Sequence, residues 1–197
     1  MDTLDAVIRG GREAGRWRMF LDRNNQARVD GDFDPDVCEL IEQEAISYDL
    51  DRNVRNTRAI VHVVQEYLGA DVGDPGIVHG DRVEWCWRPK ADISAAEAVA
   101  RELVENGARR PDIWIITTAA DVVPYQTDAG FLVTSPRFAK GLEAEHVVVC
   151  DLPQQYDDRG LAAFYVAVTR ARVTLHVVAS RDDKKRLQEL ILKQVGM

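Results

Sequence analysis

Apolar residues follow two spacings along this chain, and the spacings predict helices and strands that alternate. Repeats of three and four residues predict helices that begin near Pro35, near Asn56 or Thr57, and near Ser94, where Glu97 would complete a capping box. A further amphipathic helix is predicted over 187–195. Short runs rich in β-branched and aromatic residues predict strands at 17–21, 46–50, 82–87, 112–117, 131–134, 145–151 and 173–178.

Several of the predicted strands are continuous apolar runs rather than alternating ones. Such runs, separated by helices, are typical of a mostly parallel sheet that is covered on both faces. We therefore expect an α/β fold with three layers. Sheets of this kind bind ligands at the C-terminal ends of their strands, so we look for chemistry there. The segment 71–80 is rich in Gly, Asp and Pro and is predicted to be a loop.

Composition limits the possible functions. The chain has 197 residues, which suits one domain or one and a half, and 46% of them are hydrophobic, enough for a sizeable core. Its formal net charge of −8 argues against strong autonomous binding to nucleic acid, although a local basic groove is compatible with it. Three scattered cysteines without a CxxC pair are expected to be free thiols in a reducing cytoplasm. No apolar run is long enough to span a membrane, so we expect a cytoplasmic protein with no membrane partner.

Two segments near the N-terminus combine polar side chains with the predicted end of a strand. The first, 17–26, ends a strand at Asp22 and adds Gln26, and a carboxylate with an amide could position a water or sense a γ-phosphate. The alternative is a polar loop after an edge strand. The second, 50–58, places three arginines, including Arg55, around a helix N-terminus that favours an anion. The alternative is a capped helix with solvated charges.

The third segment, 134–143, runs from a strand into a loop rich in small and basic residues. Arg137 and Lys140 could meet phosphates, and Gly141 would let the backbone approach a ligand. Glu143 could accept a hydrogen bond from a ribose hydroxyl. The alternative is a turn with surface charges.

The fourth segment, 165–172, places Arg170 between a helix and a β-branched strand. The planar, permanently charged fork of an arginine at this junction could point at a phosphate bound at the sheet edge. Arg172 is expected to start the next strand on the surface. The alternative for Arg170 is a cation that satisfies the dipole at the end of a helix.

Taken in this order, the four segments resemble motifs III, IV, V and VI of the superfamily 1 helicases of the UvrD/Rep type. The resemblance covers most of the chain, from about Trp17 to the final helix. It implies a RecA-like, P-loop NTPase-type fold with three layers and a mostly parallel sheet, here without the P-loop itself. Residues 1–45 would be the tail of a first RecA-like domain or an N-terminal extension. Residues 46–197 would be the second RecA-like domain, without the 2B insertion of larger helicases.

The resemblance also implies a role for each candidate residue. In the family, the positions of Gln26, Arg55 and Arg170 lie at the γ-phosphate, and Arg170 would act as an arginine finger. Lys140, Gly141 and Glu143 would contact the nucleotide, with Glu143 at the ribose. Thr134, Ser135 and Arg137 would lie near the single strand of nucleic acid.

The departures from the family pattern are equally informative. The chain has no GxxxxGK[ST] segment and no Asp-Glu pair upstream of Gln26, so Walker A and Walker B are both missing. ATP and Mg would therefore be shared with a P-loop-bearing N-terminal RecA-like domain, in the same longer protein or in a separate chain. We expect the chain alone to lack ATPase activity and to bind single-stranded DNA weakly. Arg137 also replaces the usual histidine of motif V.

Two other functions stay open at this point. The first is a degenerate helicase-like module for binding or interaction, without ATPase activity, which the acidic charge and the altered motifs favour. The second is an unrelated α/β enzyme, although the four histidines lack metal-ligand spacing and no serine lies in a GxSxG context.

Overall fold

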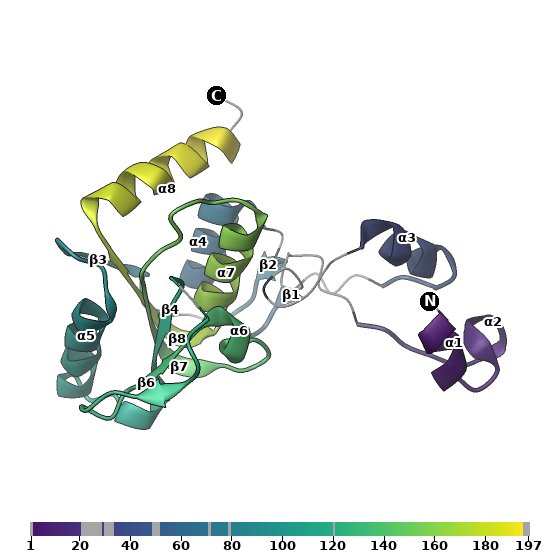
Figure 1. Ribbon diagram of the computed structural model, residues 1–197, viewed down its shortest axis with the longest axis horizontal. Coiled ribbons are helices and arrows are strands. Elements are labelled where there is room, and N and C mark those ends of the chain that lie inside the picture. Colours follow the sequence, from purple (N-terminus) through teal and green to yellow (C-terminus); the bar gives the residue numbers. More distant parts are fainter. Residues whose placement is uncertain are drawn as a thin grey trace.

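The computed structural model describes residues 2–20, 29, 34–48, 52–70, 72–78, 80–119 and 121–194. In these residues six strands form one sheet in the order β3-β8-β7-β4-β6-β5 (Figure 1). The strands are β3 (Glu84–Trp87), β4 (Ile113–Thr117), β5 (Tyr125–Gln126), β6 (Leu132–Thr134), β7 (Ala144–Cys150) and β8 (Ala171–Ala179). All neighbouring pairs are parallel except β5 with β6. Two short strands, β1 (Arg52–Asn53) and β2 (Asp74–Pro75), form a separate parallel pair.

Helices cover both faces of the sheet. One face carries α4 (Arg58–Leu68), α6 (Pro136–Ala139), α7 (Asp158–Thr169) and α8 (Arg181–Gln194), and the other carries α5 (Ile93–Glu105) (Figure 1). A 3-10 turn, η2 (Arg110–Asp112), leads into β4. The expected α/β class, with a mostly parallel sheet between two helical layers, is confirmed.

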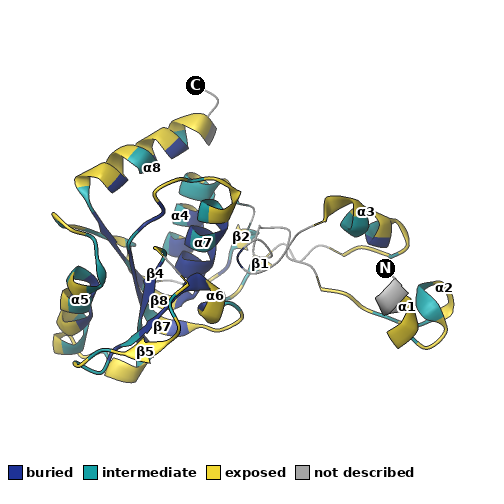
Figure 2. Cartoon of the chain, viewed as in Figure 1, coloured by how far each residue is buried: buried dark blue, intermediate teal, exposed yellow. Residues whose placement is uncertain are grey.

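The central strand β7 shows why its sequence is a continuous apolar run. Val147 and Val149 point to the layer that contains α4 and α7, while Val148 and Cys150 point to the layer that contains α5. All four are fully buried, because successive side chains of a strand point to opposite faces and both faces are covered (Figure 2). Helix α7 is buried in the same way, from Phe164 through Thr169, and is therefore apolar on most of its surface.

Side-chain caps fix where the helices begin. The Asp157 carboxylate accepts a hydrogen bond from Gly160 N at 2.8 Å and starts α7. Asp92 accepts one from Ala95 N at 3.0 Å and starts α5, so the predicted capping box at Ser94 is wrong: the competing carboxylate two residues earlier begins the helix. Among the described residues no helix is long and apolar enough to cross a membrane.

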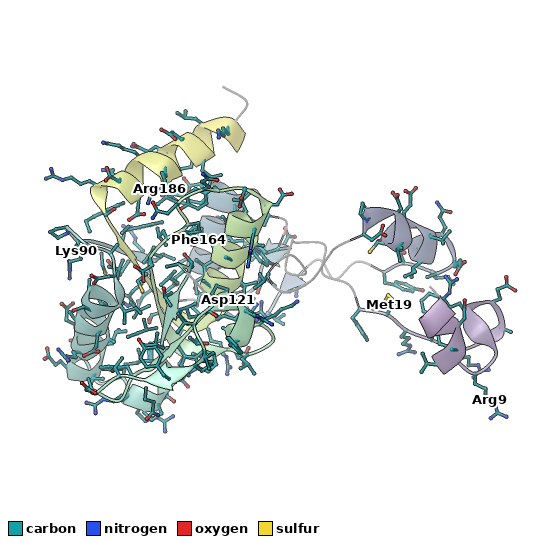
Figure 3. All side chains as sticks on the ribbon, viewed as in Figure 1. Arg9, Met19, Lys90, Asp121, Phe164 and Arg186 are labelled. Atoms are coloured by element: carbon teal, nitrogen blue, oxygen red, sulfur yellow. The ribbon has the colours of Figure 1, made fainter. Side chains whose placement is uncertain are left out.

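The N-terminal part contributes helices α1 (Asp2–Val7), α2 (Gly11–Ala14) and α3 (Pro35–Gln43), the last as predicted from Pro35. Arg12 joins them by ion pairs to Asp5 and Glu44. The strands predicted at 17–21 and 46–50 are wrong over their described residues, where no ladder forms. Most of the apolar side chains there are exposed, as at Phe20 (84%) and Ile46 (85%), while Trp17 is half-buried. Figure 3 labels Met19 in this stretch.

Candidate functional site

Three of the four predicted segments meet at one end of the sheet, where β7 and β8 begin. Ala144 and Ala171 are register partners at the first positions of these strands, and Ala144 N donates a hydrogen bond to Arg170 O at 3.0 Å. The segments around Arg55 and Glu143 reach the same place through side chains. The first segment, 17–26, is not placed at its candidate positions, because Asp22 and Gln26 lie outside the described residues.

This end is the N-terminal edge of the strands, not the C-terminal edge at which the sequence predicted chemistry. The reason is geometric. Helix α7 leaves the C-terminal edge after β7 and returns along the sheet, so its last residue, Thr169, arrives where β8 starts. Arg170, which follows Thr169 directly, is carried to the N-terminal edge with it.

Arg170 is 1% exposed and belongs to the largest fully buried side chains of the described residues. Its Nε donates a hydrogen bond to Val166 O at 3.1 Å, and Nη1 donates to Leu142 O at 3.1 Å. Nη2 donates to Thr169 Oγ1 at 3.0 Å. The guanidinium therefore ties the end of α7 to the loop before β7. The alternative considered for Arg170, a helix-end cation, describes part of this contact, since Val166 lies in the last turn of α7.

The second segment contacts this junction through Asn56, a residue that sequence reasoning considered only as a helix cap. Asn56 is 1% exposed, and its Nδ2 donates to both Thr169 O (3.0 Å) and Ala171 O (2.8 Å). Its Oδ1 accepts a hydrogen bond from Asn53 Nδ2 at 3.2 Å. No pattern in the sequence could reveal these contacts, because they join residues more than a hundred positions apart.

Arg55 lies beside Asn56 and is half-buried. Its backbone N–H donates to Asn53 Oδ1 at 3.1 Å, which fixes the backbone at this position. Its side-chain Nε is buried and has no hydrogen-bond partner among the described residues. A buried cationic donor without an acceptor is costly, so this position favours an anionic or carbonyl oxygen.

The loop between α6 and β7 carries the predicted nucleotide contacts. Lys140 ends α6, and Gly141 has a φ of +79°, a left-handed conformation that glycine adopts without strain. A Cβ atom at Gly141 would meet nothing within 4 Å, so backbone conformation rather than close packing accounts for the glycine. Glu143 is exposed and forms an ion pair with Arg172, with 3.3 Å between Oε1 and Nη1. Arg172 lies on the surface of β8, as predicted.

The three residues predicted to lie near nucleic acid differ in accessibility. Thr134 and Ser135 are 2% and 0% exposed, and Ser135 Oγ has no hydrogen-bond partner among the described residues. Only Arg137 offers its side chain to solvent. Its Nη1 lies 3.7 Å from Asp121 Oδ2, and Arg159 approaches the same carboxylate at 3.8 Å. Asp121 is labelled in Figure 3.

The C-terminal edge holds a different polar group. Thr117 Oγ1 donates to Asp151 Oδ2 at 2.8 Å, and Asp151 has a φ of +49°. Burial, together with the neighbouring Asp151 carboxylate, raises the pKa of the Cys150 thiol well above its usual range, so Cys150 is an unreactive core thiol. Across the described residues, no three His, Cys, Asp or Glu side chains are grouped so that they could hold a metal ion.

Comparisons with known proteins give a likeness in structure and none in sequence. No family model matches the chain, and no curated protein matches it. The structure is similar to the crystal structure of the C-terminal domain of a possible DNA helicase from Lactobacillus plantarum WCFS1. The two are 22% identical in sequence, the match covers 69% of this chain and 95% of that one, and the TM-score is 0.48.

Proposed function

We propose that this chain is the second RecA-like domain of a superfamily 1 helicase or translocase of the UvrD/Rep type. The observation that carries the proposal is the convergence of three segments that are distant in sequence. Asn53–Asn56, Lys140–Glu143 and Thr169–Arg172 resemble three different motifs of that family, and side-chain hydrogen bonds hold them together at one edge of the sheet. Chance matches to three motifs would not be expected to meet in space.

In this proposal the chain supplies one half of an ATP site. Arg55 is the best-placed group, because it combines positive charge with a buried donor that has no acceptor among the described residues. Arg170 would supply a second guanidinium, and Glu143 a carboxylate for a ribose hydroxyl. The P-loop and the magnesium ligands would come from a partner domain, since Walker A and Walker B are absent from this sequence. When bound, ATP with magnesium would supply the phosphoryl group for hydrolysis, and the arginines of this chain would stabilise its charge.

Contact with single-stranded DNA is proposed for the surface around Arg137. That surface is limited, because Asp121 already lies near both Arg137 and Arg159. The net charge of −8 is consistent with weak binding by the chain alone.

One observation favours the alternative, a helicase-like module that binds partners without ATPase activity. Glu143 is paired with Arg172, and the guanidinium of Arg170 is buried on internal acceptors. In a degenerate site these contacts would simply stabilise the fold. In a functional site they must exchange for contacts with the nucleotide when the P-loop domain docks.

ATP turnover distinguishes these functions. The chain is assayed alone and with a P-loop-bearing first RecA-like domain of the same helicase type, each with and without single-stranded DNA. We expect no turnover by the chain alone. In the mixture we expect turnover that falls by roughly 10³-fold in Arg55→Ala or Arg170→Ala, the lower end of the range for loss of an arginine finger.

The matched control is Arg101→Ala, an exposed arginine on α5 in the opposite helical layer, which should keep the activity of the mixture. Equal activity of the wild type and both arginine variants would support the non-catalytic alternative. Turnover by the chain alone would contradict both functions.

A further inference from the structure

We infer that Asn56 is a positioning residue that couples the two candidate phosphate-facing arginines, Arg55 and Arg170. The assignment of these arginines to a nucleotide rests on the proposed function. The coupling itself rests only on hydrogen bonds within the chain.

The side chain of Asn56 holds the backbone on both sides of Arg170. One Nδ2 atom donates to Thr169 O at 3.0 Å and to Ala171 O at 2.8 Å, the carbonyls that flank Arg170 in the sequence. Carbonyl oxygens only accept hydrogen bonds, so this geometry fixes which end of the amide faces them. Both N–H groups of the amide are used, so neither the Thr169–Arg170 peptide nor the Ala171–Arg172 peptide can rotate without breaking one of these bonds.

The other end of the same amide reaches the backbone of Arg55. Asn56 Oδ1 accepts a hydrogen bond from Asn53 Nδ2 at 3.2 Å. Asn53 Oδ1 in turn accepts from Arg55 N at 3.1 Å and from Asn56 N at 2.9 Å. Two asparagine side chains therefore form a continuous path from the backbone of Arg55 to the backbone of Arg170.

The burial of Asn56 makes this path specific. At 1% exposure, water cannot replace a lost partner of the amide, so each missing bond leaves a buried polar group unsatisfied. An apolar side chain would fill the space but could not bridge two carbonyls. Because the amide is satisfied at both ends, the backbones that carry the two arginines keep a fixed relative position, which favours joint action of their side chains on one phosphate.

The test uses Asn56→Asp in the full chain. Aspartate has nearly the same shape, but it places a carboxylate oxygen against two carbonyl oxygens in place of a donor. Accessibility of Arg170 is measured by its rate of modification with phenylglyoxal, an arginine-selective reagent, resolved for each residue by mass spectrometry. The buried thiol of Cys150, probed with a thiol reagent, reports the integrity of the core in the same sample.

We expect Arg170 to react at least about tenfold faster in Asn56→Asp, since loss of one buried hydrogen bond shifts a local opening equilibrium by roughly this factor. Cys150 should stay protected. If both sites become reactive together, Asn56 only stabilises the fold and the inference is wrong. If neither changes, Asn56 does not hold the Arg170 backbone, and the inference is equally wrong.

Two further variants complete the design. Asn106→Asp makes the same chemical change at an exposed position at the end of α5 and should leave both rates unchanged. If Asn56→Asp fails to fold, Asn53→Ala is used, because it removes the next link of the path. It should raise the rate of phenylglyoxal modification at Arg170 by a smaller factor, with Cys150 still protected. An unchanged modification rate would refute the coupling. No nucleotide enters these measurements, so they can succeed even if the ATPase assay shows no turnover.

Discussion

Replacement of Arg170 by alanine should destabilise the folded chain by about 2–4 kcal/mol, whatever its role at a nucleotide. Among the described residues the guanidinium donates hydrogen bonds to Val166 O, Leu142 O and Thr169 Oγ1. Hydrogen bonds to a charged group each contribute roughly 1.5–3 kcal/mol, and the cost of burying the charge offsets part of their sum. The expected loss of stability is therefore smaller than the sum of these hydrogen bonds.

The structure also shows which groups lose a hydrogen-bond partner when Arg170 is truncated. Thr169 Oγ1 keeps its hydrogen bonds to Tyr165 O and Val166 O when Arg170 is truncated. The carbonyl of Leu142, on the loop that carries Gly141 and Glu143, loses the Arg170 donor, and the space of a large buried side chain is left unfilled. The loop before β7 should therefore loosen first.

Urea unfolding at neutral pH, followed by tryptophan fluorescence and far-UV circular dichroism, measures the effect. Thermal unfolding gives a second measure. For a chain of this size a destabilisation of 1 kcal/mol lowers the thermal midpoint by roughly 2–4 °C, so the midpoint of Arg170→Ala should fall by roughly 5–15 °C. The matched control is Arg172→Ala, two residues away, whose surface ion pair with Glu143 should contribute less than about 1 kcal/mol.

A loss below about 0.5 kcal/mol for Arg170→Ala would refute this reasoning, because surface substitutions fall in that range. It would mean that the guanidinium is not held inside the protein in solution. An arginine that points outward would then be available to a phosphate without any rearrangement.

Three smaller predictions follow from glycines, a thiol and a histidine. Gly160→Ala should lower the thermal midpoint far more than Gly141→Ala, because a Cβ at Gly160 would lie 2.1 Å from Gln155 O. A Cβ at Gly141 has open space, so the cost there is only the strain of a left-handed backbone, about 1 kcal/mol. Cys150 should resist a thiol reagent at pH 8 until urea unfolds the chain, because burial raises its pKa; rapid labelling of native protein would contradict this. Burial lowers the pKa of His176 below its usual 6.5, so the unfolded state binds a proton first as the pH drops. The free energy of unfolding should therefore fall as the pH drops from about 7 through 6.5. His176→Gln should flatten this slope in urea midpoints measured at several pH values.

The sheet could be predicted from sequence where a strand is buried on both faces. The runs Ile113–Thr117 and Val147–Cys150 are apolar at every position or nearly so, and only a covered parallel strand explains that. The two-residue strand β5 carries no such signal, because its Tyr125 and Gln126 are both exposed. The strand predictions around Phe20 and Ile46 are wrong for the opposite reason. These segments have β propensity, but no neighbouring strand pairs with their described residues.

The site was predictable as a set of segments but not as a geometry. Charged residues beside a glycine or a strand end mark Arg55, Glu143 and Arg170 in the sequence. Their mutual arrangement depends on Asn56, whose partners Thr169 and Ala171 are 113 and 115 positions away. A buried asparagine in a helix-capping context looks like a cap, and only the fold shows that its amide is used elsewhere.

The contacts that assemble the proposed half-site also occupy it. Arg170 holds the Leu142 carbonyl, and Glu143 is paired with Arg172, so a nucleotide must displace internal partners to reach either group. Breaking the buried contact of Arg170 without replacement costs roughly 1–3 kcal/mol, which lowers the affinity of the isolated chain for a nucleotide about 5- to 160-fold. A P-loop domain would change this balance by delivering a charged phosphate to the same edge, where the buried Arg55 Nε meets no acceptor in the part of the chain that the structure describes. If the proposed function is right, Arg55 should engage the nucleotide first and Arg170 only in the assembled pair of domains. Arg55→Ala should then weaken nucleotide binding as well as slow turnover, while Arg170→Ala should slow turnover and leave binding nearly unchanged.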